Sequence, residues 1–300
     1  MTAKNSDVEI IIPTYNQADY LREALHSVQH QDFSSWQATI VNNFSSDHTA
    51  AVVSEIADPR ITLVDFANHG VIAASRNLAL RKSTAKYIAF LDSDDWWHPK
   101  KLSRCVEQLE EGVDLVCHAE EWKAPNFSRV VRYGPDSRAK YRPLLLGGNC
   151  LSTSAIVGRT EMFKTVDGFS ERSDFITAED YDLWLRLARN EYRFVFIDDV
   201  LGTFRIHSAS ASSSIARNSA AEMAVVESHL ASQHFKRGVV RRRLGRSHYS
   251  AARAFHNAGD YSSATKRFLI SLRLAPLFPR TYAGLGLTLL HSIRHRGRAQ

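Results

Sequence analysis

The chain has 300 residues, of which 44% are hydrophobic and 23% charged, with a formal net charge of +6. This composition excludes disordered and fibrous proteins and suits one large or two small globular domains. No run of about 18 uncharged apolar residues occurs, so we expect no membrane-spanning helix and no secretory signal. Cys105, Cys117 and Cys150 are odd in number and lack metal-ligand spacing. They therefore predict a reducing, cytoplasmic location.

Short β-branched runs alternate with segments of helical spacing between residues 8 and 121. Strands are predicted at residues 8–12, 38–41, 61–66, 87–91 and 114–117. Repeated strand–helix alternation predicts an α/β fold, with a mostly parallel, Rossmann-like sheet and helices on both faces. In such a sheet ligands bind at the carboxyl ends of the strands, so the loops after the strands are the place to look.

Each of the first four predicted strands is followed by a polar loop. These loops span residues 13–16, 42–47, 68–70 and 92–95. Because parallel strands end at one edge of a sheet, hydrogen-bonding groups, an aromatic ring and carboxylates should meet in one crevice.

Three aspartates, Asp92, Asp94 and Asp95, lie within four positions after the fourth strand. Crowded carboxylates raise one another's pKa unless a cation lies between them. Mg²⁺ and Mn²⁺ prefer oxygen ligands, and Mg²⁺ often shares its sphere with phosphates. The loop therefore predicts a site for a metal diphosphate, with an acidic cap of a helix over residues 96–111 as the alternative. The glycine-rich phosphate loops G-x-x-x-x-G-K-S/T and G-x-G-x-x-G are both missing after the first strand.

Five sequence blocks within residues 7–210 together resemble the family 2 glycosyltransferases of the GT-A fold. They are residues 8–16 (VEIIIPTYN), the loop after residue 41, residues 70–77 (GVIAASRN), 90–97 (FLDSDDWW) and 178–186 (AEDYDLWLR). The resemblance implies transfer of a sugar from a nucleoside diphosphate sugar with inversion at the anomeric carbon. It also implies Mg²⁺ or Mn²⁺ as cofactor.

The resemblance places the nucleotide base at the first two loops. Pro13, Thr14 and Tyr15 would line its pocket, with Tyr15 stacked on the ring. Asn42 and Asn43 stand where the family usually has two aspartates, and Asn43 would read the base edge. An amide both donates and accepts, whereas a carboxylate only accepts. UDP is therefore the first choice, with guanosine and thymidine diphosphate sugars open.

The diphosphate and the metal would lie further along the same edge. By resemblance, Arg76 would lie near the phosphates, and Asp92 and Ser93 near the ribose or the metal. Asp94 would bind the metal. His207 lies in the segment 204–207 (FRIH), which resembles a basic segment near the end of the family's domain. It would contact the metal or the diphosphate; alternatively, its side chain faces solvent.

Asp180 would be the general base for the acceptor hydroxyl. It opens a strongly patterned helix whose apolar face would fix the carboxylate against the core. Glu179 and Asp182 are its rivals. The alternative for all three is the ordinary preference for acids at helix N-termini.

The C-terminal part is predicted to be helical, with domains at residues 1–215 and 216–300. Residues 249–276 resemble one tetratricopeptide-type hairpin, and residues 279–293 read as a final helix, apolar along Leu285, Leu289 and Ile293. Residues 236–246 hold six basic residues and no acid. This run is either a solvated helix face or a peripheral contact with the inner face of a membrane. No nucleic-acid-binding motif accompanies it.

The leading hypothesis is a metal-dependent inverting glycosyltransferase of bacterial surface glycan biosynthesis, acting on a glycan or lipid-linked acceptor. One alternative is a sugar nucleotidyltransferase, which would need a glycine- and lysine-rich loop after the first strand. Another is an inactive helical-repeat adaptor or nucleotide-binding protein, supported by the two amides at Asn42 and Asn43.

Overall fold

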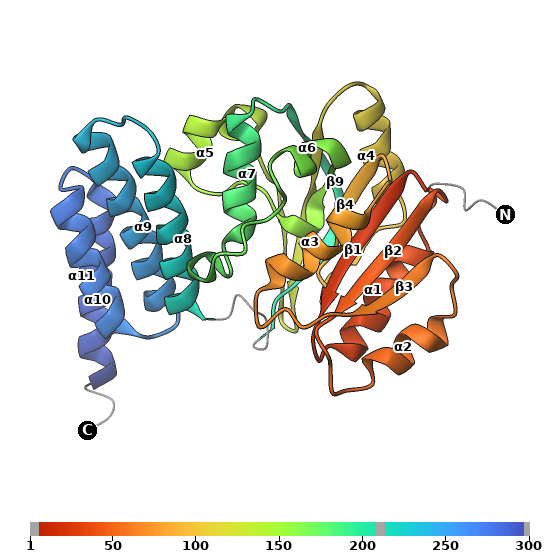
Figure 1. The fold of residues 1–300 in the computed structure, drawn as a ribbon. Helices are drawn as coiled ribbons and strands as arrows, with labels where there is room; N and C mark the ends of the chain where they lie inside the picture. Colours follow the sequence, from red (N-terminus) through yellow and green to blue (C-terminus); the bar gives the residue numbers. More distant parts are fainter. Residues whose placement is uncertain (1–5, 208–213, 297–300) are drawn as a thin grey trace. The chain divides into compact units, whose positions relative to one another are not determined.

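The structure is a computed structural model, and it describes residues 6–207 and 214–296. The chain divides into two compact units, residues 1–208 and 209–300. The sequence had placed this boundary after residue 215. Each unit is described by itself below (Figure 1).

The first unit is built on one nine-stranded sheet with the order β3-β2-β1-β4-β8-β6-β9-β5, and β7 pairs with β6. The strands are β1 (Val8–Thr14), β2 (Trp36–Asn42), β3 (Ile61–Asp65), β4 (Tyr87–Phe90), β5 (Trp96–Trp97), β6 (Leu115–Ala124), β7 (Phe127–Val131), β8 (Ile156–Arg159) and β9 (Phe194–Arg205). All seven residues of β1 are buried, as expected for a central strand that is covered on both faces. The five strands predicted from the sequence are confirmed.

Strands β3, β2, β1 and β4 are parallel, and the register of the first three places their carboxyl ends at one level. Thr14 pairs with Asn42, and Asn42 pairs with Asp65. The predicted α/β, GT-A-like fold class is confirmed, with the refinement that β8 runs antiparallel to both β4 and β6. Ser154, just before β8, contacts Asp92 at the edge where the parallel strands end. Because β8 starts at that edge, it runs back across the sheet in the opposite direction.

Seven helices flank the sheet in the described part of the first unit (Figure 1). They are α1 (Ala18–Gln29), α2 (Thr49–Ile56), α3 (Ile72–Lys82), α4 (Lys101–Glu110), α5 (Tyr141–Gly147), α6 (Thr160–Thr165) and α7 (Glu179–Arg189). The helix expected over residues 96–111 begins only at Lys101. Pro99 disfavours helical backbone at the residue before it, and Trp96 and Trp97 instead pair with β9.

The second unit is helical in its described residues. Its helices are α8 (Ile215–Ala231), α9 (Arg237–Asn257), α10 (Tyr261–Leu274) and α11 (Pro279–Arg296). Helices α9 and α10 form a hairpin that turns at Gly259, where φ is +82° and glycine is favoured. Ala252, Ala264 and Phe268 form its core. The helical C-terminal region is confirmed, and its tetratricopeptide character stays a prediction. None of the helices described in either unit is long and apolar enough to cross a membrane.

Candidate active site

The loops after β1, β2 and β3 are tied together by Asn43. Its backbone N–H donates to the Thr14 carbonyl (3.0 Å), and its side-chain oxygen accepts from the Asn68 N–H (3.0 Å). Beside it the Tyr15 ring is 58% exposed, and Pro13 is buried in β1 opposite Val41. The Thr14 hydroxyl is buried and has no hydrogen-bond partner among the residues the structure describes. The edge therefore offers an exposed ring and an unpaired hydroxyl close together.

The neighbouring amide, Asn42, is buried and has a structural role. Its NH₂ group donates to Asp65 Oδ1 (2.7 Å), while its oxygen accepts from the N–H (3.1 Å) and the hydroxyl (2.6 Å) of Ser45. A carboxylate at this position could not donate to Asp65 and would repel it. The family usually has an aspartate at this position. Here an asparagine is explained by Asp65 on β3, which needs a donor opposite it.

We expect Asn42→Asp to lower the free energy of unfolding by about 1–3 kcal/mol, the usual cost of leaving a buried polar group without its partner. Urea unfolding followed by circular dichroism measures the change. Asn43→Asp is the matched control, since a carboxylate there keeps the acceptor that Asn68 uses. Equal stability of the two variants would contradict the role assigned to Asn42.

In the aspartate loop after β4, Asp92 and Asp94 are half-buried and Asp95 is fully buried. Asp95 is buried and accepts from the Ser154 hydroxyl (2.6 Å) and from the Arg205 N–H (2.9 Å). Ser154 also accepts from the Asp92 N–H (3.1 Å). Asp95 and Ser154 therefore fix the loop, and the sequence offered no signal for Ser154 beyond its place after the paired glycines of residues 147–148.

Asp92 and Asp94 contact different basic side chains. Asp92 Oδ1 accepts from Arg76 (2.6 Å), and Asp94 Oδ2 lies 2.8 Å from His207 Nε2. Ser93, between them, is buried and donates to the side-chain oxygen of Gln17, a residue that sequence reasoning missed. The predicted metal pair, Asp94 and His207, is thus brought together from positions far apart in the chain.

Two carboxyl groups of this loop have raised pKa values. Burial, and then the charge of Asp92, raises the pKa of Asp94. Burial, and then the charge of Asp94, raises the pKa of Asp95 well above its usual value. Within residues 6–207 and 214–296, no cluster of three or more His, Cys, Asp or Glu side chains is arranged to hold a metal ion. Asp94 and His207 supply a carboxylate oxygen and an imidazole nitrogen 2.8 Å apart, two donor types found at metal sites in proteins.

Arg76 joins the aspartate loop to the start of α7. It is buried and donates to Asp92 (2.6 Å) and to Glu179 Oε1 (2.7 Å). The Glu179 carboxylate also accepts from the Thr177 N–H (2.8 Å). The two carboxylates raise the pKa of Arg76 against the effect of its burial, so its charge is fixed. Its Nε has no partner in the described part of the chain.

Of the three acids at the start of α7, only Asp180 forms no ion pair with any described residue. Glu179 pairs with Arg76, and Asp182 is buried against Arg186 (2.7 Å). Asp180 is half-buried, and burial, followed by the charge of Glu179, raises its pKa to about 7. The charges of Arg76 and Asp92 also act on the pKa of Asp180, so these three groups lie near one another.

Two polar side chains lie next to the Asp180 carboxylate. Asn149 Nδ2 is 3.4 Å and Thr153 Oγ1 3.5 Å from Asp180 Oδ2, while Oδ1 accepts from the Tyr181 N–H (2.7 Å). The long distances leave Oδ2 weakly bonded. Oδ2 is therefore the oxygen of Asp180 that is better placed to accept a proton.

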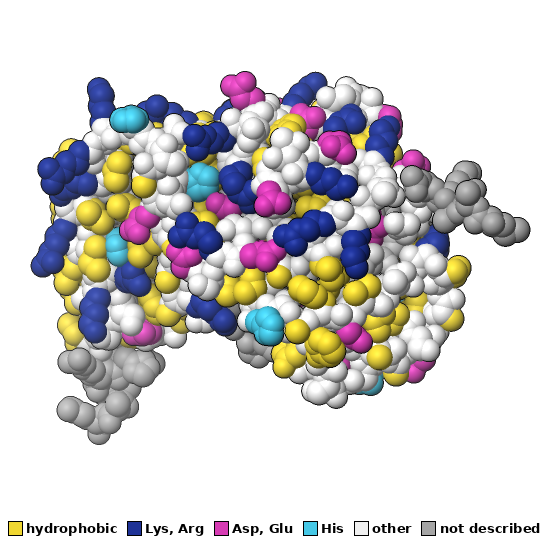
Figure 2. All heavy atoms as spheres, in the orientation of Figure 1, with side chains coloured by type: hydrophobic (Ala, Val, Ile, Leu, Met, Phe, Trp, Pro, Cys, Tyr) yellow, Lys and Arg dark blue, Asp and Glu magenta, His cyan; other side chains and the backbone are white. Residues whose placement is uncertain are grey.

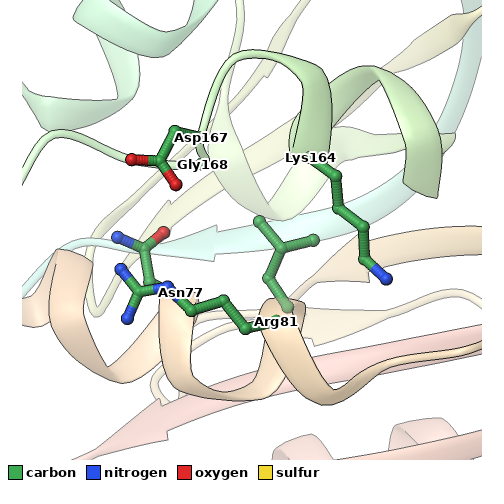
Figure 3. A pocket seen from close by; sticks show the side chains of 6 residues that line it. Asn77, Arg81, Lys164, Asp167 and Gly168 are labelled. Atoms are coloured by element: carbon green, nitrogen blue, oxygen red, sulfur yellow. The ribbon is translucent and has the colours of Figure 1, made fainter.

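A separate hollow lies on α3 and the turn after α6 (Figure 3). It is lined by Asn77, Leu80, Arg81, Lys164, Asp167 and Gly168. Its cations are engaged, since Lys164 donates to the Ser83 carbonyl (2.8 Å) and Arg81 pairs with Glu171 (2.9 Å). We assign it to the packing of these helices.

The family model of glycosyl transferase family 2 matches residues 9–164, more than half of the chain. The chain belongs to this family. It is therefore a glycosyltransferase, and the matched segment carries the loops of the parallel half of the sheet and the aspartate loop.

Curated bacterial relatives agree with this assignment. TuaG of Bacillus subtilis, a glycosyltransferase named for teichuronic acid biosynthesis, is 28% identical over 211 residues, which are 69% of this chain and 81% of TuaG. WfgD of Escherichia coli, named as a UDP-Glc:alpha-D-GlcNAc-diphosphoundecaprenol beta-1,3-glucosyltransferase, is 29% identical over 209 residues, covering 69% and 79%.

Solved structures share the fold. S. aureus TarS 1–349 in complex with UDP-GlcNAc matches with a TM-score of 0.66 and 18% identity, over 97% of this chain and 92% of that one. The mannosyltransferase PcManGT from Pyrobaculum calidifontis, in complex with GDP-Man and Mn²⁺, matches with a TM-score of 0.62 and 18% identity, over 97% and 87%.

Proposed function

We propose that this family 2 enzyme is a metal-dependent, inverting glycosyltransferase of bacterial surface polysaccharide biosynthesis. It moves a sugar from a nucleoside diphosphate sugar, with a UDP-sugar as first choice, to a hydroxyl of a glycan or lipid-linked acceptor. The observation that carries the proposal is the Asp180 carboxylate, which forms no ion pair with a residue that the structure describes and has a pKa raised to about 7. It lies near Arg76 and Asp92, whose charges act on its pKa.

The donor is assigned to the sheet edge. Tyr15, whose ring is exposed, stacks on the base, and Thr14 and Asn43 line the base pocket beside it. Arg76 holds Asp92 in place at the ribose and phosphates. The names of the relatives support a nucleotide sugar donor, because WfgD is named for UDP-Glc and TarS is solved with UDP-GlcNAc.

Asp94 and His207 are assigned as the metal ligands, with Mg²⁺ or Mn²⁺ as the ion. The raised pKa of Asp94 supports this, because a cation would relieve the repulsion from Asp92. A divalent ion, when bound, stabilises the charge that grows on a departing diphosphate. Arg76 fixes Asp92 beside these ligands and so limits where the diphosphate can lie.

Transfer with inversion needs one carboxylate behind the acceptor oxygen. As that oxygen bonds to the anomeric carbon, the bond from the carbon to the diphosphate oxygen breaks and the hydroxyl proton passes to Asp180. Asn149 and Thr153 orient the carboxylate. Glu179 and Asp182 are held by arginines and are less able to accept a proton.

The test is a panel of nucleotide sugars assayed for hydrolysis and for calorimetric binding, each with Mn²⁺ and with a chelator. We expect metal-dependent binding of one UDP-sugar and slow release of UDP. An inactive adaptor would bind no nucleotide under either condition, which would overturn the proposal. The adaptor alternative has lost part of its support, because Asn42 is explained by its bond to Asp65.

Asn43→Asp should tighten UDP binding by about 1 kcal/mol, or about fivefold, because a charged acceptor would replace a neutral one for the uracil N–H. The bond from the Asn68 N–H survives the change, so the loop should keep its shape. Calorimetry with UDP and Mn²⁺ measures the effect, with Asn43→Ala as control. Weaker binding than in the wild type would point to a base that requires the amide donor.

A further inference from the structure

Helix α11 packs on the rest of the second unit through its small and polar face. Thr281, Gly284 and Thr288 are buried. A Cβ on Gly284 would lie 2.6 Å from the Phe268 ring, so the close approach of α11 to α10 requires glycine there. Thr281 Oγ1 lies 3.1 Å from the Ser271 hydroxyl of α10. Leu285 is the α11 leucine that packs against the core of Ala252, Ala264 and Phe268.

The opposite side of α11 is apolar and exposed. The exposed residues between positions 282 and 290, together with position 293, are Tyr282, Ala283, Gly286, Leu287, Leu289, Leu290 and Ile293. We call them the α11 outer face. Leu290 is 56% and Ile293 70% exposed, and Leu277, in the turn before α11, is 96% exposed. Helices of globular proteins normally bury their leucines and expose polar residues. Here the pattern is reversed.

The unit that carries this face is strongly basic. Residues 209–300 contain 15 Lys and Arg and 3 Asp and Glu, which gives a formal charge of +12, whereas residues 1–208 carry −6. The exposed cations of the described part are Arg217, Lys236, Arg237, Arg241, Arg242, Arg246, Arg253, Lys266, Arg273 and Arg280. Figure 2 shows hydrophobic side chains interspersed with Lys and Arg over α10 and α11.

We propose that the α11 outer face and Leu277 bind the surface of an anionic lipid bilayer, with α11 lying in the plane of the interface. The leucines enter the boundary of the acyl chains while exposed cations of the same unit meet lipid phosphates. The Tyr282 ring is 55% exposed and its hydroxyl donates to the Pro276 carbonyl, which suits the headgroup level. A second copy of the chain is disfavoured as the occupant, because it would bring two units of charge +12 together.

This inference goes beyond the proposed function and does not depend on it. The test is flotation of the full chain with vesicles of phosphatidylcholine and phosphatidylglycerol, and with vesicles of phosphatidylcholine alone. We expect binding to the anionic vesicles, and weaker binding when salt rises from about 0.1 M to about 1 M and the Debye length falls from about 10 Å to about 3 Å. Failure to bind anionic vesicles at the lower salt would overturn the proposal.

A triple variant distinguishes vesicle binding through the apolar α11 outer face from binding through the positive charge of the unit. Leu277→Ser, Leu290→Ser and Ile293→Ser together should lower the vesicle partition coefficient at least about tenfold, because each removes several CH₂ or CH₃ groups from the interface. All three side chains are exposed, so thermal unfolding should change little. The matched control is Phe127→Ser with Val130→Ser on β7, two side chains that are each 47% exposed. Equal binding of the triple variant and this control would contradict the proposal.

Insertion itself can be observed at one position. The three native cysteines are buried, so Leu290→Cys can be labelled selectively with a polarity-sensitive fluorophore. We expect a blue shift and an increase in emission with anionic vesicles. Unchanged emission overturns insertion. A blue shift that grows with protein concentration without lipid, and that accompanies a dimer in light scattering, would instead assign the face to a second copy.

Discussion

Asp180→Asn is expected to lower turnover by about 10²- to 10⁴-fold, the usual worth of general-base catalysis. The amide keeps the shape of the side chain and can still hydrogen-bond the acceptor hydroxyl, but it cannot take its proton. Donor affinity should change little, because the residues assigned to the nucleotide lie on the sheet-edge loops. Steady-state kinetics with the donor found in the nucleotide-sugar panel, combined with calorimetry, separates the two effects.

Two neighbours serve as matched controls for Asp180. Asp182→Asn should cost much less turnover and more stability, because it breaks the buried pair with Arg186. Glu179→Gln removes one of the two carboxylates that hold Arg76 and should weaken donor binding. Near-normal transfer by Asp180→Asn, with loss in one of these neighbours, would reassign the base. Activity in all three variants would end the case for general-base catalysis by this helix.

The same residue sets the expected pH dependence. A base must be ionised to accept a proton, and the pKa of Asp180 is raised to about 7. The value of kcat/KM should therefore rise with pH through about 7 and then level off. In Glu179→Gln the profile should shift to lower pH, because the charge of Glu179 is the second cause of the raised pKa. An unshifted profile in that variant would mean that another group titrates.

Asp94→Ala is expected to weaken metal-dependent donor binding by more than about 10²-fold. Loss of a residue that only orients a metal ligand already costs about 10- to 100-fold, and Asp94 is assigned as a ligand itself. The fold should survive, because the change removes a carboxylate whose pKa is raised by burial and by Asp92. Calorimetry with UDP across a Mn²⁺ series measures the loss.

Asp95→Ala is the contrasting control for Asp94. It breaks the bonds to the Ser154 hydroxyl and the Arg205 N–H, so it should lower the urea midpoint as well as activity. His207→Gln should weaken metal binding without a comparable loss of stability. Unchanged Mn²⁺ dependence in Asp94→Ala would show that the aspartate loop serves only to shape the turn after β4.

The sequence predicted those features that depend on local pattern. The central strands β1 and β4 appear in it as continuous apolar runs because both faces of these strands are covered. The position of Asp92 and Asp94 follows from the rule that strand ends share one edge. The antiparallel β8 was not foreseen, since its direction depends on where the chain returns to the sheet.

The contacts between residues far apart in the chain could not be predicted from local sequence pattern either. Arg76 meets Glu179 across 103 positions, and Asp94 meets His207 across 113. The resemblance named both Asp94 and His207, but it did not give the distance between the members of either pair. The choice of Asp180 over Glu179 and Asp182 rested on the resemblance alone. The structure adds a physical reason, because arginines hold the other two carboxylates.

The raised pKa values of Asp94 and Asp180 have a consequence for protein engineering. A carboxyl whose pKa is higher in the folded chain than in the unfolded chain opposes folding increasingly as pH rises above its unfolded value of 3.8, and fully above its folded value. At neutral pH, replacing either aspartate by a neutral side chain should therefore raise the free energy of unfolding. A laboratory selection that rewards heat resistance alone would favour such replacements, and would return robust proteins that no longer transfer sugar.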